Sequence, residues 1–209
     1  MTAAAARWER QVRARLEETV ALRRDSGLPA DPADLWSARA KRFAAAVGYA
    51  RRGEPVLDRL LAEPATAYVD VGAGTGRYAV PLARSGRMVT AVEPSAGMRA
   101  VLGTRSRLTV VPSPWAEGVA SGDVVFAAHV LFLIPSAAAF LEAMTRSAGH
   151  ACYLVLAGIH SDAVYDPLWR HFHGRPRAVN PTFLDAVALL RELGARPDVE
   201  LVTPSGGTR

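Results

Sequence analysis

The chain lacks several features that would assign it to a special class of protein. It has a single cysteine, Cys152, so no disulfide can form within the chain, and a reducing compartment suits it. No apolar run approaches the roughly 20 residues of a membrane-spanning helix, and the longest one, residues 124–134, is interrupted by His129. The N-terminus lacks the apolar core of a signal peptide. We therefore expect a cytoplasmic protein with no membrane partner.

Lysine is nearly absent as well, since Lys41 is the only one and arginine carries almost all the positive charge. The 25 basic and 20 acidic residues give a net charge of +5, which is compatible with a nucleic-acid partner. However, the longest basic clusters are the pairs Arg23-Arg24 and Arg51-Arg52, whereas electrostatic binding sites typically use longer tracts. The charge therefore allows nucleic-acid binding without favouring it.

The length and the periodicity of the chain indicate an α/β protein. Half of the 209 residues are hydrophobic, which is enough for one domain with a sizeable core. Helical periodicity predicts helices over 3–24, from Asp34 to about residue 52, and over 56–62. Strands and helices then alternate, which implies a mostly parallel sheet with helices on both faces. The predicted strands are 67–71, 88–92, 107–111, 123–130, 151–157 and 198–203, and the later helices are 75–84, 95–102, 136–147 and 181–193.

The most informative segment is residues 69–76, which read Val-Asp-Val-Gly-Ala-Gly-Thr-Gly. Gly72, Gly74 and Gly76 stand at alternate positions directly after an apolar strand. Glycine lets a backbone turn sharply and lets a ligand approach where a Cβ would be in the way. The helix that follows offers unpaired N–H groups at its start. This turn is therefore predicted to hold a ligand.

The spacing of the glycines excludes two common kinds of ligand turn. A dinucleotide turn would need a third glycine at Arg77, and a P-loop would need a lysine followed by Ser or Thr after the last glycine. What remains is Asp-x-Gly-x-Gly-x-Gly, beginning at Asp70. The next predicted strand, 88–92, ends in Glu93, and a carboxylate there can accept hydrogen bonds from ribose hydroxyls.

These two motifs, in this order, resemble motif I and the second-strand acid of the class I S-adenosylmethionine-dependent methyltransferases. The similarity covers about residues 32–203. It implies a Rossmann-like, doubly wound sheet of seven strands, of which six are predicted here, so the C-terminal strand hairpin is expected to be incomplete. We expect an N-terminal helical extension over residues 1–54 and a Rossmann-like methyltransferase domain over residues 55–209.

The resemblance implies S-adenosyl-L-methionine as the cofactor. The glycine backbone would face its methionine and ribose parts, Asp70 would bind its ammonium group, and Glu93 its ribose. The alternatives are a helix-capping role for Asp70 and an ordinary strand-end acid at Glu93. The residues predicted to bind the cofactor are Asp70, Gly72, Ala73, Gly74, Gly76, Glu93, Pro94, Trp115, Ala116, Glu117 and Ala128.

The predicted adenine loop departs from the family pattern. After the strand at 107–111, the acid that usually accepts the adenine amino hydrogens falls on Pro114. Trp115 could stack on the ring, which is worth about 1 kcal/mol beyond area burial, and Glu117 could supply the missing acceptor. The alternative is a tryptophan that caps the core beside a solvated glutamate.

His129 follows the fourth strand, where the family places the substrate. It is the best-placed group to accept a proton near neutral pH, although a structural role is the alternative. Trp36, Arg39 and Phe43 resemble the preceding helix that closes over the cofactor in many such enzymes. Plain helix packing is the alternative for the two aromatic residues.

The long segment 158–180 is predicted to form a substrate-facing lid that brings His171 and His173 to the acceptor. On an extended strand these two histidines would share one face and could bind a metal, with His160 or Asp166 as a third ligand. Because the segment offers no cysteine and no tighter cluster, we expect no metal site.

The predicted function is in-line transfer of a methyl group to a small molecule, in which the protein mainly aligns the nucleophile and excludes water. Base methylation is disfavoured, since the chain has neither an Asn/Asp-Pro-Pro-Tyr loop nor a Pro-Cys nucleophile. The alternatives are an RNA or protein methyltransferase, a non-catalytic subunit that binds the cofactor, and a nicotinamide-dependent oxidoreductase.

Overall fold

The computed structural model describes residues 2–27, 32–158 and 161–203. It divides into two compact units. Of the described residues, 2–27, 129–141, 156–158 and 161–199 form the helical unit, and 32–128, 142–155 and 200–203 form the sheet unit. A separate cap over residues 1–54 stays a prediction. Among the described residues, no helix combines the length and the apolarity needed to cross a bilayer.

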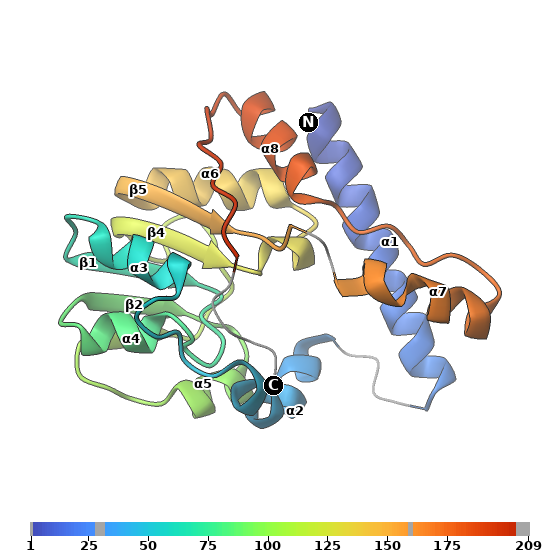
Figure 1. Cartoon of the computed structure of the whole chain (residues 1–209), viewed down its shortest axis with the longest axis horizontal. Coiled ribbons are helices and arrows are strands. Elements are labelled where there is room, and N and C mark those ends of the chain that lie inside the picture. The colour runs from blue at the N-terminus through green and yellow to red at the C-terminus, as the bar shows by residue number, and fades with distance from the viewer. Residues whose placement is uncertain (1, 28–31, 159–160, 204–209) are drawn as a thin grey trace. The chain divides into compact units, whose positions relative to one another are not determined.

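The sheet unit is built on five parallel strands in the order β3-β2-β1-β4-β5, and the labels β2, β1, β4 and β5 follow one another in Figure 1. The central strand β1 pairs with β2 and β4 and is buried from Tyr68 to Val71. Such strands read as nearly continuous apolar runs, which is why the sequence predicts them well. The strands are β1 (Ala67–Val71), β2 (Met88–Val92), β3 (Leu108–Val111), β4 (Gly122–Ala128) and β5 (Ala148–Val155).

The helices confirm most of the predicted α/β alternation. One face of the sheet, which carries Tyr68 and Phe126, forms a single core with the apolar residues of α3 and α4. Residues 75–78 continue the glycine turn, so the helix that follows begins at Ala79 and not at residue 75. The helices of the sheet unit are α2 (Pro32–Val47), α3 (Pro55–Ala62), α4 (Ala79–Arg84) and α5 (Ala96–Leu102). The others are α1 (Ala3–Asp25), the 3₁₀ helix η1 (Leu131–Leu133), α6 (Ala137–Ser147), α7 (Ser161–His173) and α8 (Phe183–Glu192).

One prediction about the C-terminal third of the chain is wrong, and one helix there was not predicted. Residues 198–203 form no strand, and their apolar members Val199, Leu201 and Val202 are exposed. An alternating pattern becomes a strand only where a neighbouring strand accepts its hydrogen bonds, and the five-stranded sheet ends at β5. The predicted lid contains the helix α7, which the sequence hides because Pro167 lies inside it.

A buried carboxylate joins α3 to the edge strand β5. Glu63, at the end of α3, is 6% exposed and accepts a short hydrogen bond from the Tyr153 hydroxyl. Its carboxylate also lies 2.9 Å from His150 Nε2 and 2.9 Å from Arg59 Nη1. The Tyr153 hydrogen bond is the main reason why the pKa of Glu63 is lowered, and it outweighs the opposing effect of burial.

We expect Tyr153→Phe to lower the free energy of unfolding by about 2 kcal/mol, because it removes a hydrogen bond to a buried charged acceptor. A carboxyl whose pKa is lowered on folding stabilises the protein above its unfolded pKa, near 4.5. The difference from the wild type should therefore be full at neutral pH and shrink below about pH 4. Urea unfolding at several pH values measures it, with the exposed Tyr165→Phe as the control. Equal effects of the two substitutions would contradict the prediction.

Candidate functional site

The predicted cofactor residues meet at the carboxyl edge of the sheet. Val71, the last residue of β1, is paired with Val92 at the end of β2 and with Ala127 near the end of β4. Gly72, Glu93 and Ala128 therefore stand side by side at the ends of three neighbouring parallel strands. Ligands of open α/β sheets bind at this edge.

The glycine turn requires glycine for two different reasons. Gly72, Gly74 and Gly76 all have positive φ angles, of 70°, 57° and 88°. A Cβ on Gly76 would lie 2.4 Å from Leu102 Cδ1 and 2.7 Å from Val80 Cγ2, so Gly76 lets the turn pack on the core. A Cβ on Gly74 would meet nothing within 4 Å. Gly74 thus faces open space, as a ligand-facing position should.

Glu93 links the glycine turn to the start of α5. Its side chain is buried, and one carboxylate oxygen accepts a hydrogen bond from the Gly74 N–H at 2.8 Å. The other oxygen accepts from the Ser95 N–H, also at 2.8 Å. Each carboxylate oxygen can accept a further hydrogen bond. The group is therefore held in place by the backbone and can still receive ribose hydroxyls.

Asp70 lies in the middle of the same edge and is only 3% exposed. Burial raises the pKa of Asp70 to about 8, although a hydrogen bond from the Ala79 N–H opposes the shift, and the nearby Glu93 carboxylate adds to it. This bond is the contact that the alternative, helix-capping role of Asp70 would make, since Ala79 begins α4. A cationic ligand would favour the ionised form of this acid.

The side chains of the predicted adenine loop differ in their exposure to solvent. Trp115 is half-buried, whereas Ala116 and Glu117 are exposed. The Glu117 carboxylate pairs with Arg146 on α6 through two contacts of 3.0 and 3.1 Å. Glu117 would have to share its carboxylate with Arg146 to serve as an adenine acceptor.

His129 directly follows β4, is exposed, and has a φ of 60°. Left-handed backbone at a residue other than glycine is uncommon and is found preferentially at functional sites. Pro94, beside Glu93, is also exposed, and its carbonyl accepts a hydrogen bond from Arg99.

The lid residues do not form the extended pair that a metal would need. His171 and His173 lie in the last turn of α7, where residues two apart point to opposite sides of the helix. Asp166 pairs with Arg170 at 2.6 Å, and His160 lies outside the described residues. No metal-binding group of three His, Cys, Asp or Glu side chains occurs in the part of the chain that the structure describes.

The predicted acceptor residues on α2 lie close together. Trp36 and Phe43 make an edge-to-face contact with ring centroids 5.8 Å apart, and Arg39 is exposed. Three residues that hold Glu93 and α2 in place were not predicted from the sequence, namely Ser37, Ser95 and Arg99. Their only sequence signal is the position of Ser95 as the N-cap of α5.

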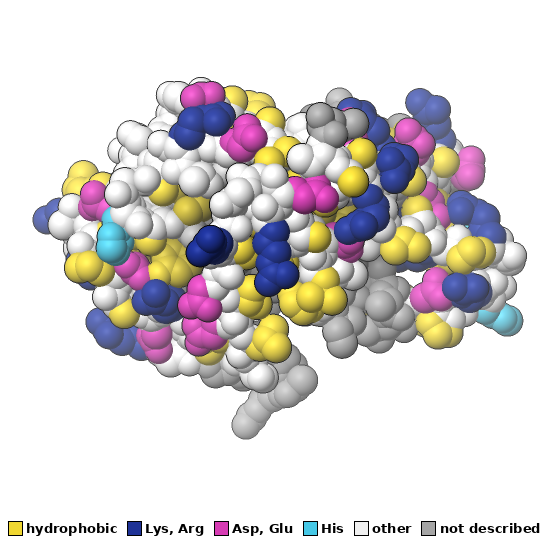
Figure 2. Space-filling model, turned by 90° about the horizontal axis from the view of Figure 1, so that it is seen from above, with side chains coloured by type: hydrophobic (Ala, Val, Ile, Leu, Met, Phe, Trp, Pro, Cys, Tyr) yellow, Lys and Arg dark blue, Asp and Glu magenta, His cyan; other side chains and the backbone are white. Residues whose placement is uncertain are grey.

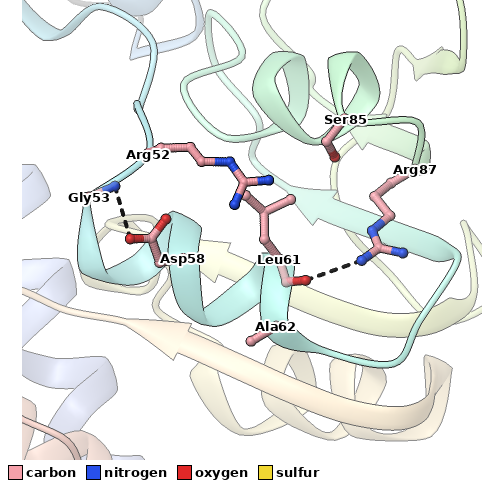
Figure 3. A pocket seen from close by; sticks show the side chains of 7 residues that line it. All are labelled: Arg52, Gly53, Asp58, Leu61, Ala62, Ser85 and Arg87. Atoms are coloured by element: carbon pink, nitrogen blue, oxygen red, sulfur yellow. Dashed lines mark hydrogen bonds between the residues drawn. The ribbon is translucent and has the colours of Figure 1, made fainter.

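A cavity of about 350 Å³ lies at the opposite edge of the sheet unit (Figure 3). Arg87, one of its lining residues, directly precedes β2, whereas Glu93 follows that strand. Arg87 Nη2 donates to the Leu61 carbonyl at 3.1 Å, and Asp58 accepts from the Gly53 N–H at 2.9 Å. This cavity is therefore separate from the predicted cofactor site.

The sequence from β1 to β5 is similar to a known protein family. A family model described as a methyltransferase domain matches residues 69–156, from the glycine turn to the end of β5. Residues 69–156 thus belong to an S-adenosylmethionine-dependent methyltransferase domain. No curated protein matches the sequence of this methyltransferase.

Solved structures support the fold of the methyltransferase domain. Magnesium protoporphyrin IX methyltransferase from Synechocystis PCC 6803 with bound SAH matches with a TM-score of 0.61 and 19% identity, over 78% of this chain and 88% of that one. The DhpI-SAM-HEP complex matches with a TM-score of 0.54 and 22% identity, over 76% of this chain and 85% of that one. At these identities the likeness shows a shared Rossmann-like fold, which confirms the predicted fold class.

We expect alanine to be tolerated at Gly74 far better than at Gly76. Both positions have a left-handed backbone, which costs a residue with a Cβ about 1–2 kcal/mol. Only Gly76→Ala would also overlap the buried side chains of Leu102 and Val80, at a further cost of about 1–3 kcal/mol. Urea unfolding of the two variants measures the difference. Equal losses of stability would contradict the distinction.

We expect Asp70→Asn to change how stability depends on pH. Between about pH 4 and pH 8 the folded wild type keeps a proton on Asp70 that the unfolded chain releases, so its free energy of unfolding falls as pH rises. The slope from this group is up to ~1.4 kcal/mol per pH unit. Asp70→Asn lacks it and should gain stability relative to the wild type from pH 5 to pH 8, as measured by urea unfolding. Parallel pH profiles would contradict the raised pKa.

Proposed function

We propose that this protein transfers the methyl group of S-adenosyl-L-methionine to a small-molecule acceptor. The observation that carries the proposal is the hydrogen bond between the buried Glu93 carboxylate and the Gly74 N–H. It brings a ribose acceptor and an open glycine turn to one edge of the sheet. A nucleoside joined to an amino acid is the kind of ligand that needs both.

The chain's own residues would bind and orient this cofactor, which supplies an electrophilic methyl group when bound. Glu93 would accept the ribose hydroxyls, Asp70 would ionise against the ammonium group, and Trp115 would stack on the adenine. The backbone of the glycine turn would follow the methionine part. Further contacts are proposed for Ala73, Pro94, Ala116, Glu117 and Ala128.

His129 is proposed as the proton acceptor for the nucleophile. It directly follows β4 in the chain, and its left-handed φ of 60° supports a functional role. Trp36, Arg39 and Phe43 on α2, together with His171 and His173 on α7, are proposed to contact the acceptor.

Three observations support a small acceptor over a nucleic acid. The matched structures include one that is named for methylating magnesium protoporphyrin IX. The sequence has neither the Asn/Asp-Pro-Pro-Tyr loop nor the Pro-Cys nucleophile of enzymes that methylate nucleobases. On the face drawn in Figure 2, basic side chains alternate with acidic and apolar ones and do not gather in one patch.

Calorimetry with S-adenosylhomocysteine tests the cofactor. We expect the wild type to bind it with a dissociation constant between about 1 μM and 1 mM, the usual range for enzyme ligands, and not to bind NADH. Glu93→Gln should weaken binding about tenfold or more, because it removes charge-assisted hydrogen bonds to the ribose. Glu142→Gln, an exposed glutamate of α6, serves as the matched control. A folded wild type that binds NADH alone would overturn the proposal.

The acceptor class is tested separately by incubating the protein with cofactor carrying a radioactive methyl group and with a fractionated cell extract. Label in the low-molecular-mass fraction supports the proposal. Label confined to RNA or protein would replace the small acceptor with a macromolecular one.

A further inference from the structure

The helix α2 is tied to the elements of the cofactor site near its N-terminal end. The Ser37 hydroxyl oxygen lies 3.0 Å from that of Ser95 and accepts a hydrogen bond from the Gly97 N–H at 3.2 Å. Ser95 is the N-cap of α5 and Gly97 lies in its first turn, shortly after Glu93 in the chain. Ser37 thus attaches α2 to the segment that follows the predicted ribose acceptor.

The two helices approach so closely that only glycine fits between them. A Cβ on Gly97 would lie 2.5 Å from the Ser37 Cα and 2.6 Å from the Ser37 carbonyl oxygen. These are backbone atoms, so any side chain at Gly97 would push α2 away from α5. The contact is therefore specific for this placement of α2.

The same contact continues to the glycine turn through Glu93. Ser95 donates its N–H to one Glu93 oxygen while Gly74 donates to the other, both at 2.8 Å. Arg99 also donates to the Glu93 carbonyl at 2.9 Å. Ser37 and Gly74 are thus joined through a single buried carboxylate.

The C-terminal end of α2 is hydrogen-bonded directly to the residue that follows the glycine turn. Arg77, the residue after Gly76, donates from Nη1 to the Val47 carbonyl at 2.7 Å, and its own carbonyl accepts from the Ala50 N–H at 2.9 Å. The bond to Val47 caps the C-terminal end of α2, and the bond from Ala50 holds the segment that follows the helix. The helix is therefore anchored at both ends to residues that frame the predicted cofactor site.

We propose that docking of α2 and binding of the cofactor ribose at Glu93 stabilise each other, with Ser37, Gly97 and Arg77 as positioning residues. A ribose held by Glu93 favours the carboxylate orientation that Ser95 needs in order to hold Ser37. By linkage, whatever holds α2 in place then raises cofactor affinity by the same factor. This inference rests on the proposed function, because it assumes a ribose at Glu93.

The sequence supplies a direct reporter of α2 docking. Lys41, the only lysine, lies on α2 and is exposed, so endoproteinase Lys-C cuts the protein at this one place. A protease needs the helix to open locally before it can cut. We expect S-adenosylhomocysteine at ten times its dissociation constant to slow the cut about tenfold.

A relocated lysine provides the control. Lys41→Arg combined with Arg10→Lys moves the only lysine to an exposed position on α1. Cleavage there should not respond to the ligand. If the wild type binds S-adenosylhomocysteine but Lys41 is cut equally fast with and without it, the coupling is overturned while the proposed function stands. If the wild type does not bind it, the proposed function itself fails.

The positioning residues are tested by affinity. Ser37→Ala should weaken S-adenosylhomocysteine binding about fivefold, the equivalent of one ordinary hydrogen bond, and Arg42→Ala on the exposed face of α2 should not change it. In a Glu93→Gln background the Ser37→Ala effect should disappear, which a merely structural role would not produce. Gly97→Ala should abolish both the affinity and the protection of Lys41. An undiminished Ser37→Ala effect in the Glu93→Gln background would overturn the coupling.

Discussion

The Glu93 carboxylate is the interaction on which the arrangement of the sheet unit's carboxyl edge depends. A buried anion is tolerated only when its oxygens receive hydrogen bonds. Here the donors are two backbone N–H groups that are far apart in the sequence, one from the glycine turn and one from the start of α5. The carboxylate therefore determines where the turn and α5 lie relative to each other, and α2 follows through Ser37.

Asp70 lies close to this anion, and the two acids are held in different ways. Glu93 accepts two strong backbone hydrogen bonds, whereas Asp70 is almost fully buried and accepts one from Ala79. Asp70 therefore stays protonated until a positively charged group binds beside it. Functional sites commonly contain such pairs of carboxyls in contrasting environments. A cationic ligand bound beside Asp70 would favour the release of this proton.

The glycines of the turn show how packing and binding share one short segment. Gly76 is required by the core, since Leu102 and Val80 occupy the space a side chain would need. Gly74 borders open space and instead donates its N–H to Glu93. Arg77 then extends the turn to the end of α2. One turn therefore anchors the core, faces the ligand site and holds the neighbouring helix.

Much of the fold was predictable because the information is local. The bounds of β1 and β2 agree with the prediction, because each strand is a short apolar run with a clear end signal. Three glycines follow β1, and an acid follows β2. The glycine turn and Glu93 were predictable because their chemistry lies in spacing along the chain. By contrast, α7 was missed because Pro167 interrupts its pattern, and the strand predicted at residues 198–203 does not form. Whether an alternating segment pairs depends on a partner strand that is distant in the chain.

The sequence by itself thus determined the alternating α/β architecture, the glycine turn and the acid at the end of β2, all of which depend on neighbouring residues. Only the tertiary structure decided that Glu93 bonds Gly74, that Glu117 pairs with Arg146, and that Ser37 lies against Gly97. These contacts join residues from different elements, and no periodicity in the chain encodes them. They arise because buried polar groups must find partners and because close-packed helices admit only certain side chains.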